Sequence, residues 1–292
     1  MDLPPAPVDP RTSWDLPAFG QMPVTEVLSD TVTRVLAPNP SPMTLDGTNT
    51  YVVGHPGRAA IVVDPGPDDA DHLDRVVATA ADRDVEVAAI VVTHHHVDHT
   101  EAAAALGARL GCPVHAPLQA DTAHAGRVLA DGDVVDVPGF EVRVVATPGH
   151  CADHVAFRLG DGALLTGDHV LGRGTSVVAH PDGDLVAYLD SLRRALAIGA
   201  HVLHPGHGPT LSEDPQAVLH FYADHREFRL KQILAAIDAG AATPAELVAT
   251  IYAEVDRRLW GAAEASTRAA LDHLAASGQL RTDRDGRVQR TG

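Results

Sequence analysis

Residues 93–100 read Thr-His-His-His-Val-Asp-His-Thr, and they directly follow the apolar run 88–92, which is typical of a buried strand. Alternate side chains of an extended segment point the same way, so His94 and His96 can reach one point. His95 should point the opposite way, and we exclude it as a ligand. A strand that ends in so many nitrogen donors predicts a metal site at the end of a sheet.

Asp98 and His99 follow where the chain turns into the next helix, and they can face a second point nearby. Imidazole and carboxylate donors together suit zinc, with iron or manganese as alternatives. Four donors cannot complete two metal sites, so we expect further ligands downstream. Three candidates each follow a strand and stand beside a glycine, which lets the backbone turn sharply: His150 in T-P-G-H, Asp168 in T-G-D and His207 in P-G-H-G.

Chance has to be weighed because the chain holds 18 histidines. A single histidine outside these motifs is more often structural, and we leave His115, His201 and His204 in that class. Four motifs in this order are not explained by chance. Beside them, Asp64 ends a strand and could orient a ligand imidazole, although an aspartate before proline also forms turns.

The 292 residues allow one large domain, or a medium domain and a small one. A formal net charge of −17 argues against a chain that coats nucleic acid through a general basic surface. The N-terminus has no signal-peptide pattern, and no apolar run approaches the roughly 20 residues that span a bilayer. Only Cys112 and Cys151 are present. We therefore expect no membrane and no disulfide framework, and a reduced cytoplasmic setting.

Three regions follow one another along the chain. Residues 1–20 are rich in proline and predict a loose arm, and 21–212 mix strand and helix patterns. Residues 213–292 are helical, with Thr243 to Glu246 as a capping box and a final hairpin that turns at Asp285-Gly286. Expected strands are 32–36, 49–53, 59–63, 85–92, 134–137, 140–145, 155–159 and 201–204, and expected helices are 71–81, 100–110, 185–198, 216–239 and 264–276.

The four motifs, in their order, resemble the metallo-β-lactamase superfamily over about residues 23–212. The resemblance implies an α/β fold, a four-layer αββα sandwich, with a two-zinc site at the edge of its two sheets. His94, His96 and His150 would bind one zinc, Asp98, His99 and His207 the other, and Asp168 would bridge both. The true lactamases place cysteine or serine where Asp168 stands, which argues against antibiotic hydrolysis as the main activity.

A narrower resemblance adds a small helical winged-helix domain after the sandwich. With this domain, the chain is similar to the β-lactamase-like endoribonuclease group, which includes a mitochondrial enzyme that cuts single-stranded RNA. This resemblance bears on the architecture more than on the substrate. The segments that carry it are 47–51, 171–175, 225–229 and 232–234.

These features predict a dinuclear zinc-dependent hydrolase in which the two metals share a hydroxide. Asp98 could also orient this nucleophile, and His154 could contact substrate or donate a proton. We expect Thr48, Asn49 and Thr175 to line the substrate site. Cys151 stands where relatives have threonine, and we interpret it as a small buried residue.

The substrate remains open between single-stranded RNA and a small ester or thioester, as in relatives similar to glyoxalase II. The first 212 residues hold 12 basic and 27 acidic residues, a balance that repels RNA. The later residues hold ten basic and twelve acidic, and the last hairpin carries Arg281, Arg284, Arg287 and Arg290 as possible phosphate contacts.

Two alternatives belong to other classes. A non-catalytic winged-helix nucleic-acid binder would have a closed metal site, usually with cysteines, whereas the proposed ligands contain none. A redox diiron protein would need another carboxylate near the motif and a flavin partner domain, and the sequence shows neither.

Overall fold

Two sheets form the centre of the molecule. The structure is a computed structural model that describes residues 3–117, 125–284 and 287–291. The first sheet has seven strands in chain order: β1 (Thr25–Val27), β2 (Val32–Leu36), β3 (Asn49–Val53), β4 (Ala59–Val63), β5 (Glu86–Val91), β6 (Val114–Ala116) and β7 (Ala125–Val128). The second has five, ordered β12-β11-β10-β9-β8: β8 (Val134–Val137), β9 (Phe140–Ala146), β10 (Val155–Leu159), β11 (Leu164–Gly167) and β12 (Leu203–Pro205).

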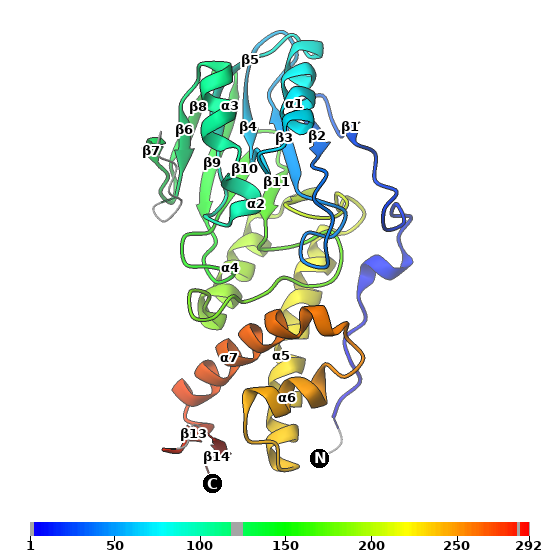
Figure 1. Cartoon of the computed structure of the whole chain (residues 1–292), viewed down its shortest axis with the longest axis vertical. Helices are drawn as coiled ribbons and strands as arrows, with labels where there is room; N and C mark the ends of the chain where they lie inside the picture. Colours follow the sequence, from blue (N-terminus) through cyan, green and yellow to red (C-terminus); the bar gives the residue numbers. More distant parts are fainter. Residues whose placement is uncertain (1–2, 118–124, 285–286, 292) are drawn as a thin grey trace.

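The two sheets pack face to face, with a helical layer on each outer side (Figure 1). Ile61 and Val91 of the first sheet meet Phe157 and Leu165 of the second in the core between them. The helices α1 (Ala70–Asp82) and α3 (Ala103–Leu110) cover the first sheet, and α4 (Leu185–Ile198) covers the second. The predicted αββα sandwich is therefore confirmed.

One predicted helix is divided in two. The pattern over 100–110 predicts a single helix, but α2 (Val97–Thr100) and α3 are separated at Glu101 and Ala102. The N–H of Ala102 donates to the carbonyl of Gly66 at 3.1 Å, which removes it from the helical hydrogen-bond series. Gly111 ends α3 as expected, with a φ of 68°.

The C-terminal part consists of α5 (Pro215–Asp238), α6 (Pro244–Ile251), the 3₁₀ turn η2 (Arg257–Leu259), α7 (Trp260–Ala276) and the hairpin strands β13 (Leu280–Thr282) and β14 (Val288–Arg290). Thr243 and Glu246 form the predicted capping box. The predicted Asp285-Gly286 turn lies outside the described residues. Leu219 of α5 and Leu271 of α7 share a core with Leu192 of α4. We keep 21–212 and 213–292 as the proposed domain limits, with this core between them.

The N-terminal segment is not a loose arm near Arg11, where that prediction is wrong. A short 3₁₀ turn, η1 (Pro10–Ser13), leaves Arg11 only 5% exposed. Its guanidinium donates to the carbonyls of Leu171 at 2.7 Å and Gly174 at 2.6 Å, and it lies 5.5 Å from the ring centre of Tyr222. Proline-rich composition does not prevent docking when one cation satisfies buried carbonyls and an aromatic face.

No helix in the described parts of the chain combines the length and apolar character that a bilayer crossing needs.

Candidate metal centre

The predicted ligands come from α2 and from four loops that meet at one edge of the sandwich. Residues 92–96 link β5 to α2, and the other loops follow β9, β11 and β12. Asp64, at the end of β4, has a φ of 50°, and its carboxylate accepts from both the backbone N–H and the hydroxyl of Thr93, at 2.7 and 2.8 Å. A backbone conformation that L-residues rarely adopt is thus held by two buried hydrogen bonds at the entrance of the histidine motif.

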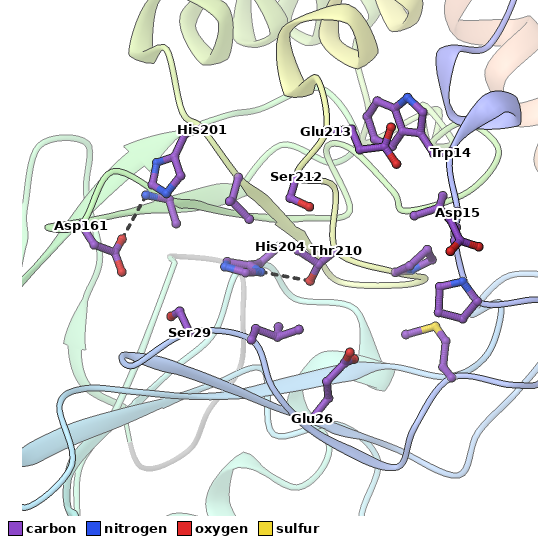
Figure 2. A pocket seen from close by; sticks show the side chains of 17 residues that line it. Trp14, Asp15, Glu26, Ser29, Asp161, His201, His204, Thr210, Ser212 and Glu213 are labelled. Carbon is purple, nitrogen blue, oxygen red and sulfur yellow. Dashed lines mark hydrogen bonds between the residues drawn. The ribbon is translucent and has the colours of Figure 1, made fainter.

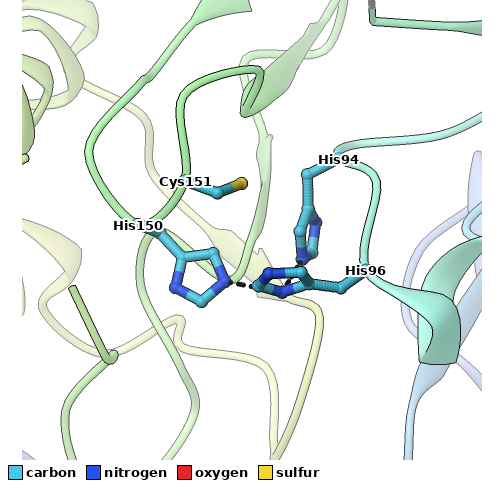
Figure 3. Close-up of side chains that lie close together, drawn as sticks. All are labelled: His94, His96, His150 and Cys151. Atoms are coloured by element: carbon cyan, nitrogen blue, oxygen red, sulfur yellow. Dashed lines mark hydrogen bonds between the residues drawn. The ribbon is translucent and has the colours of Figure 1, made fainter. Parts of the chain in front are cut away.

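The first group consists of His94, His96 and His150, whose rings converge in Figure 3. His96 Nδ1 lies 3.0 Å from His94 Nε2 and 3.0 Å from His150 Nε2. Tetrahedral zinc with bonds of about 2.0–2.1 Å would place its nitrogen ligands about 3.3 Å apart, so the three atoms fit one ion. Burial, then the charge of His150, lowers the pKa of His96 to about 4, which keeps its lone pair free.

The second group consists of Asp98, His99 and His207. Asp98 Oδ2 lies 3.2 Å from His207 Nε2 and 3.5 Å from His99 Nε2. Burial alone would lower the pKa of His207, but Asp168 and Asp98 outweigh it and raise the pKa to about 9. The position between these groups therefore attracts positive charge, as a cation site should.

Asp168 lies between the two groups. Its Oδ1 is 3.3 Å from His207 Nε2, and its Oδ2 is 3.8 Å from His150 Nε2. Among the described residues, Asp168 Oδ1 and His99 Nε2 are buried without a hydrogen-bond partner. Such atoms are costly unless something binds them, and a metal ion would. The geometry fits the predicted bridging role.

Close backbone approach explains two of the glycines in the motifs. A Cβ on Gly206 would meet Asp168 Oδ1 at 2.7 Å, and one on Gly167 would meet His154 Nε2 at 2.7 Å. Neither distance leaves room for a side chain.

Neighbouring groups orient the imidazoles. His99 Nδ1 donates to Asp64 Oδ2 at 2.9 Å, so Asp64 has the orienting position that the sequence suggested. His150 Nδ1 donates to the carbonyl of Val177 at 2.7 Å, and His207 Nδ1 to that of Gly47 at 3.1 Å. Each bond leaves the other ring nitrogen free to face the centre.

His154 does not have the predicted catalytic geometry. It is 1% exposed, its Nδ1 lies 2.8 Å from Thr147 Oγ1, and its Nε2 accepts the backbone N–H of Asp168 at 3.1 Å. Burial, then the charge of His150, holds its pKa well below the usual value. Both nitrogens are occupied, so His154 can position Asp168 but cannot reach a substrate.

Thr48 and Asn49 also correct the prediction, since both are fully buried. Thr48 Oγ1 accepts from Asn39 at 3.0 Å, and Asn49 donates to the carbonyls of Pro205 and Gly208 at 2.9 and 2.8 Å. They brace the loop that carries His207 and do not line a substrate site. Thr175 alone of the three faces a cavity.

Cys151 and His95 complete the surroundings. The sulfur of Cys151 lies within 4.8 Å of the ligand nitrogens of the first group (Figure 3). It donates to Asp153 Oδ1 at 3.3 Å, and His95 Nδ1 lies 2.8 Å from the same oxygen. His95 is thus hydrogen-bonded to Asp153 and is not among the donors of the two groups described above.

Two cavities of similar size lie beside the N-terminal and the C-terminal segments of the molecule. One of about 290 Å³ lies beneath the N-terminal segment and is lined by Asp15, Glu26, Asp161 and Glu213 but by none of the predicted ligands (Figure 2). The other, of about 300 Å³, is bounded by residues 171–177 and by the C-terminal helices. Sequence reasoning missed Ser176, Arg226 and Arg229 in its wall. The segment 225–229 was noted only as part of a resemblance.

Known protein families and solved structures match the fold described above. The family model of the metallo-beta-lactamase superfamily matches residues 43–207, and that of the beta-lactamase associated winged helix domain matches 243–292. Two solved structures superpose over most of the chain. A metallo-beta-lactamase family protein from Thermus thermophilus has a TM-score of 0.76 at 24% identity and covers 91% of this chain and 100% of its own. A beta-lactamase domain protein from Burkholderia ambifaria has 0.77 at 23%, with 96% of each chain covered.

Curated relatives are more similar in sequence. The lactamase-like protein adaB of Aspergillus niger is 35% identical, with 80% of this chain and 76% of its own covered. The atrochrysone carboxyl ACP thioesterase of Aspergillus fumigatus is 36% identical, covering 79% and 76%. The beta-lactamase-like protein 2 homolog of Drosophila melanogaster is 32% identical, covering 90% and 94%. With the candidate ligands in place, the chain is a hydrolase of the metallo-β-lactamase superfamily with an associated C-terminal winged-helix domain.

Proposed function

We propose that this chain is a dinuclear metal-dependent hydrolase of small-molecule thioesters or esters, with zinc as the metal. The observation that carries the dinuclear proposal is the position of Asp168, which presents one oxygen to each of two ligand groups. His94, His96 and His150 would hold one ion, and Asp98, His99 and His207 the other. When bound, such ions supply a water of lowered pKa and polarise the substrate oxygen.

The protein's own groups would orient the reaction. The side chain of Asp98 is 25% exposed, more than that of Asp168 at 14%, so its carboxylate can also align a nucleophile. Asp64 holds His99, and His154 holds the backbone of Asp168. These two therefore act through the ligands.

Three features support a small substrate. A relative with 36% identity is named as an ACP thioesterase. The cavity beside the centre has a volume of about 300 Å³, which suits a small organic group. The chain carries a formal charge of −17, which weakens attraction to a polyanion.

Cleavage of single-stranded RNA is the second candidate because Arg281, Arg284 and Arg287 are exposed on the final hairpin. In Figure 1 this hairpin lies at the opposite end of the C-terminal helices from α2 and the ligand loops. A phosphate contact there would leave RNA far from the metals. We also propose a cytoplasmic setting, which the two free cysteines support.

The test is to load the purified chain with zinc and offer it acyl thioesters of N-acetylcysteamine in parallel with a fluorescently quenched single-stranded RNA. We expect thiol release, no RNA cleavage, and loss of thiol release in Asp168→Ala. RNA cleavage that disappears in the same variant, without thiol release, would replace this proposal with the endoribonuclease one.

A further inference from the structure

The 300 Å³ cavity lies between the two domains, close to the candidate metal centre. Apolar side chains form much of its wall, among them Met43, Leu45, Val255 and Leu259. Of the residues that the structure describes, no aspartate or glutamate lines it, although the whole chain has 39 acidic residues against 22 basic ones. An apolar wall without carboxylates in so acidic a protein indicates a ligand with both apolar and anionic parts.

Two arginines supply the anion-binding chemistry. Arg226 is 6% exposed, donates to the carbonyl of Ser176, and lies 4.9 Å from the ring centre of Tyr188. Arg229 lies 4.5 Å from the ring centre of Tyr252 and donates to Gln232 at 2.7 Å. Within the described residues, neither guanidinium forms an ion pair, and the Nε atom of each is buried without a partner. Arg226 is buried and Arg229 half-buried, and a guanidinium nitrogen that is buried without a partner is costly until an anion binds it.

Residues of the cavity wall form hydrogen bonds with predicted metal ligands. Ser176 lines the cavity and donates to the carbonyl of Asp168, and the neighbouring Val177 accepts from His150. Pro42, Met43 and Leu45 also line the cavity, a short way before Gly47, whose carbonyl accepts from His207. The backbone segments of the cavity wall therefore continue into hydrogen bonds with residues of both metal-binding groups.

His225 also lines the cavity, beside the two arginines. Its pKa is lowered to about 3 by burial first, and then by the charges of Arg226 and Arg229. Near neutral pH this imidazole is uncharged and adds a polar group without a competing charge.

We propose that this cavity binds the acyl group of the substrate and that Arg229, with Arg226, selects an acyl group that carries a carboxylate remote from its thioester. The apolar wall would hold the carbon skeleton, and the carboxylate would pair with the guanidinium groups. This assignment rests on the proposed thioesterase function. It narrows that function to anionic, partly apolar acyl groups.

The experiment compares two thioesters of uncharged N-acetylcysteamine with the zinc-loaded full chain. Both carry an eight-carbon acyl chain, which ends in a carboxylate in one substrate and in a carboxamide in the other. We expect kcat/KM to favour the carboxylate by about tenfold or more, the difference that a charge-assisted hydrogen bond can make. Arg229→Gln should remove most of this preference, because kcat/KM should fall much more for the carboxylate than for the carboxamide.

Arg257→Gln is the matched control. Arg257 lies 5.1 Å from the ring centre of Trp260 in the same domain, but it does not line the cavity. It should keep the wild-type preference. Equal kcat/KM for both substrates in the wild type would overturn the proposal, as would equal losses for both substrates in Arg229→Gln.

A second pair of substrates locates the anion. Octanoyl pantetheine and octanoyl phosphopantetheine differ only by a phosphate on the thiol side. We expect Arg229→Gln to affect them equally. A selective loss for the phosphorylated substrate would instead assign the cavity to the thiol carrier and overturn the acyl assignment.

Calorimetric titration with suberate, the acid product, separates the two proposals. Binding that Arg229→Gln weakens about tenfold, without hydrolysis of any thioester, would support the cavity and refute the thioesterase function. Hydrolysis without suberate binding and without carboxylate preference would leave the function and refute the cavity assignment.

Discussion

The metal centre and the wing both concentrate charged side chains, but the protein places them in different surroundings. His94, His99 and His207 are fully buried at the centre, where they face Asp98 and Asp168. On the wing, formed by β13 and β14, the arginines are exposed. Interactions are strong where water is excluded and weak where it is present, and exposed ion pairs contribute only about 0–1 kcal/mol. Burial, more than the number of charges, marks the functional region.

The wing and the metal centre also differ in what stabilises them. The wing is stabilised by apolar packing of Leu274, Leu280 and Val288. The centre contains polar atoms without protein partners, which reduce stability until an ion binds. Four changes test this difference, from the largest expected effect to the smallest.

Replacing Asp168 by alanine should give the largest loss. The variant removes the carboxylate between the two ligand groups, so we expect hydrolysis to fall by on the order of 10³ or more, about 4 kcal/mol of transition-state stabilisation. Bound zinc per chain, measured by plasma emission spectrometry, should fall with it. An active variant with full metal content would refute the bridging role.

Removing the metal should destabilise the fold. If zinc saturates the wild-type site at about 100 times its Kd, chelation should cost about 2.7 kcal/mol, a factor of about 100 in the folding equilibrium. The melting temperature should fall by roughly 5–10 °C on chelation and recover when zinc is added. No change in either direction would argue against a metal at the centre.

Replacing Asp64 by asparagine should have an intermediate effect. The amide cannot accept from both Thr93 and His99 as the carboxylate does, so we expect zinc affinity and activity to fall by about 10–100-fold. Asp153→Asn is the matched control because Asp153 accepts in the same way from His95, which is not a predicted ligand. Zinc competition titrations of both variants would show the difference, and equal losses would contradict it.

Replacing Arg281, Arg284 and Arg287 together by glutamine should have the smallest effect. These side chains are exposed, so thioester hydrolysis should stay within about twofold of the wild type. Steady-state kinetics would measure it. A loss beyond tenfold would show that the wing takes part in the reaction and would remove the contrast between the two regions.

Sequence patterns were reliable where local chemistry decides the structure. The strands 32–36, 49–53 and 59–63 were predicted with the observed limits because β-branched runs between turn residues favour strands. Thr243 capped its helix as expected. The helix predicted at 100–110 begins only at Ala103, because the carbonyl of Gly66, distant in the sequence, takes the N–H of Ala102.

The residues of the site also fall into those that the sequence identified and those whose roles it did not. Ligand candidates could be identified because His, Asp and Gly recur after strands. The roles of Thr48, Asn49 and His154 could not, because each polar residue has a buried backbone or side-chain partner that no spacing reveals.

The sequence by itself determined the order of donors along the strands, the choice of imidazole and carboxylate, and the family, because these depend on residue type and spacing along one segment. Only the tertiary structure decided which donor atoms lie together, that Arg11 docks beside Leu171, and that Arg226 and Arg229 line a largely apolar cavity. Those relations join residues that lie far apart in the sequence. They depend on how the two sheets and the C-terminal helices pack, and the hydrophobic core sets that packing.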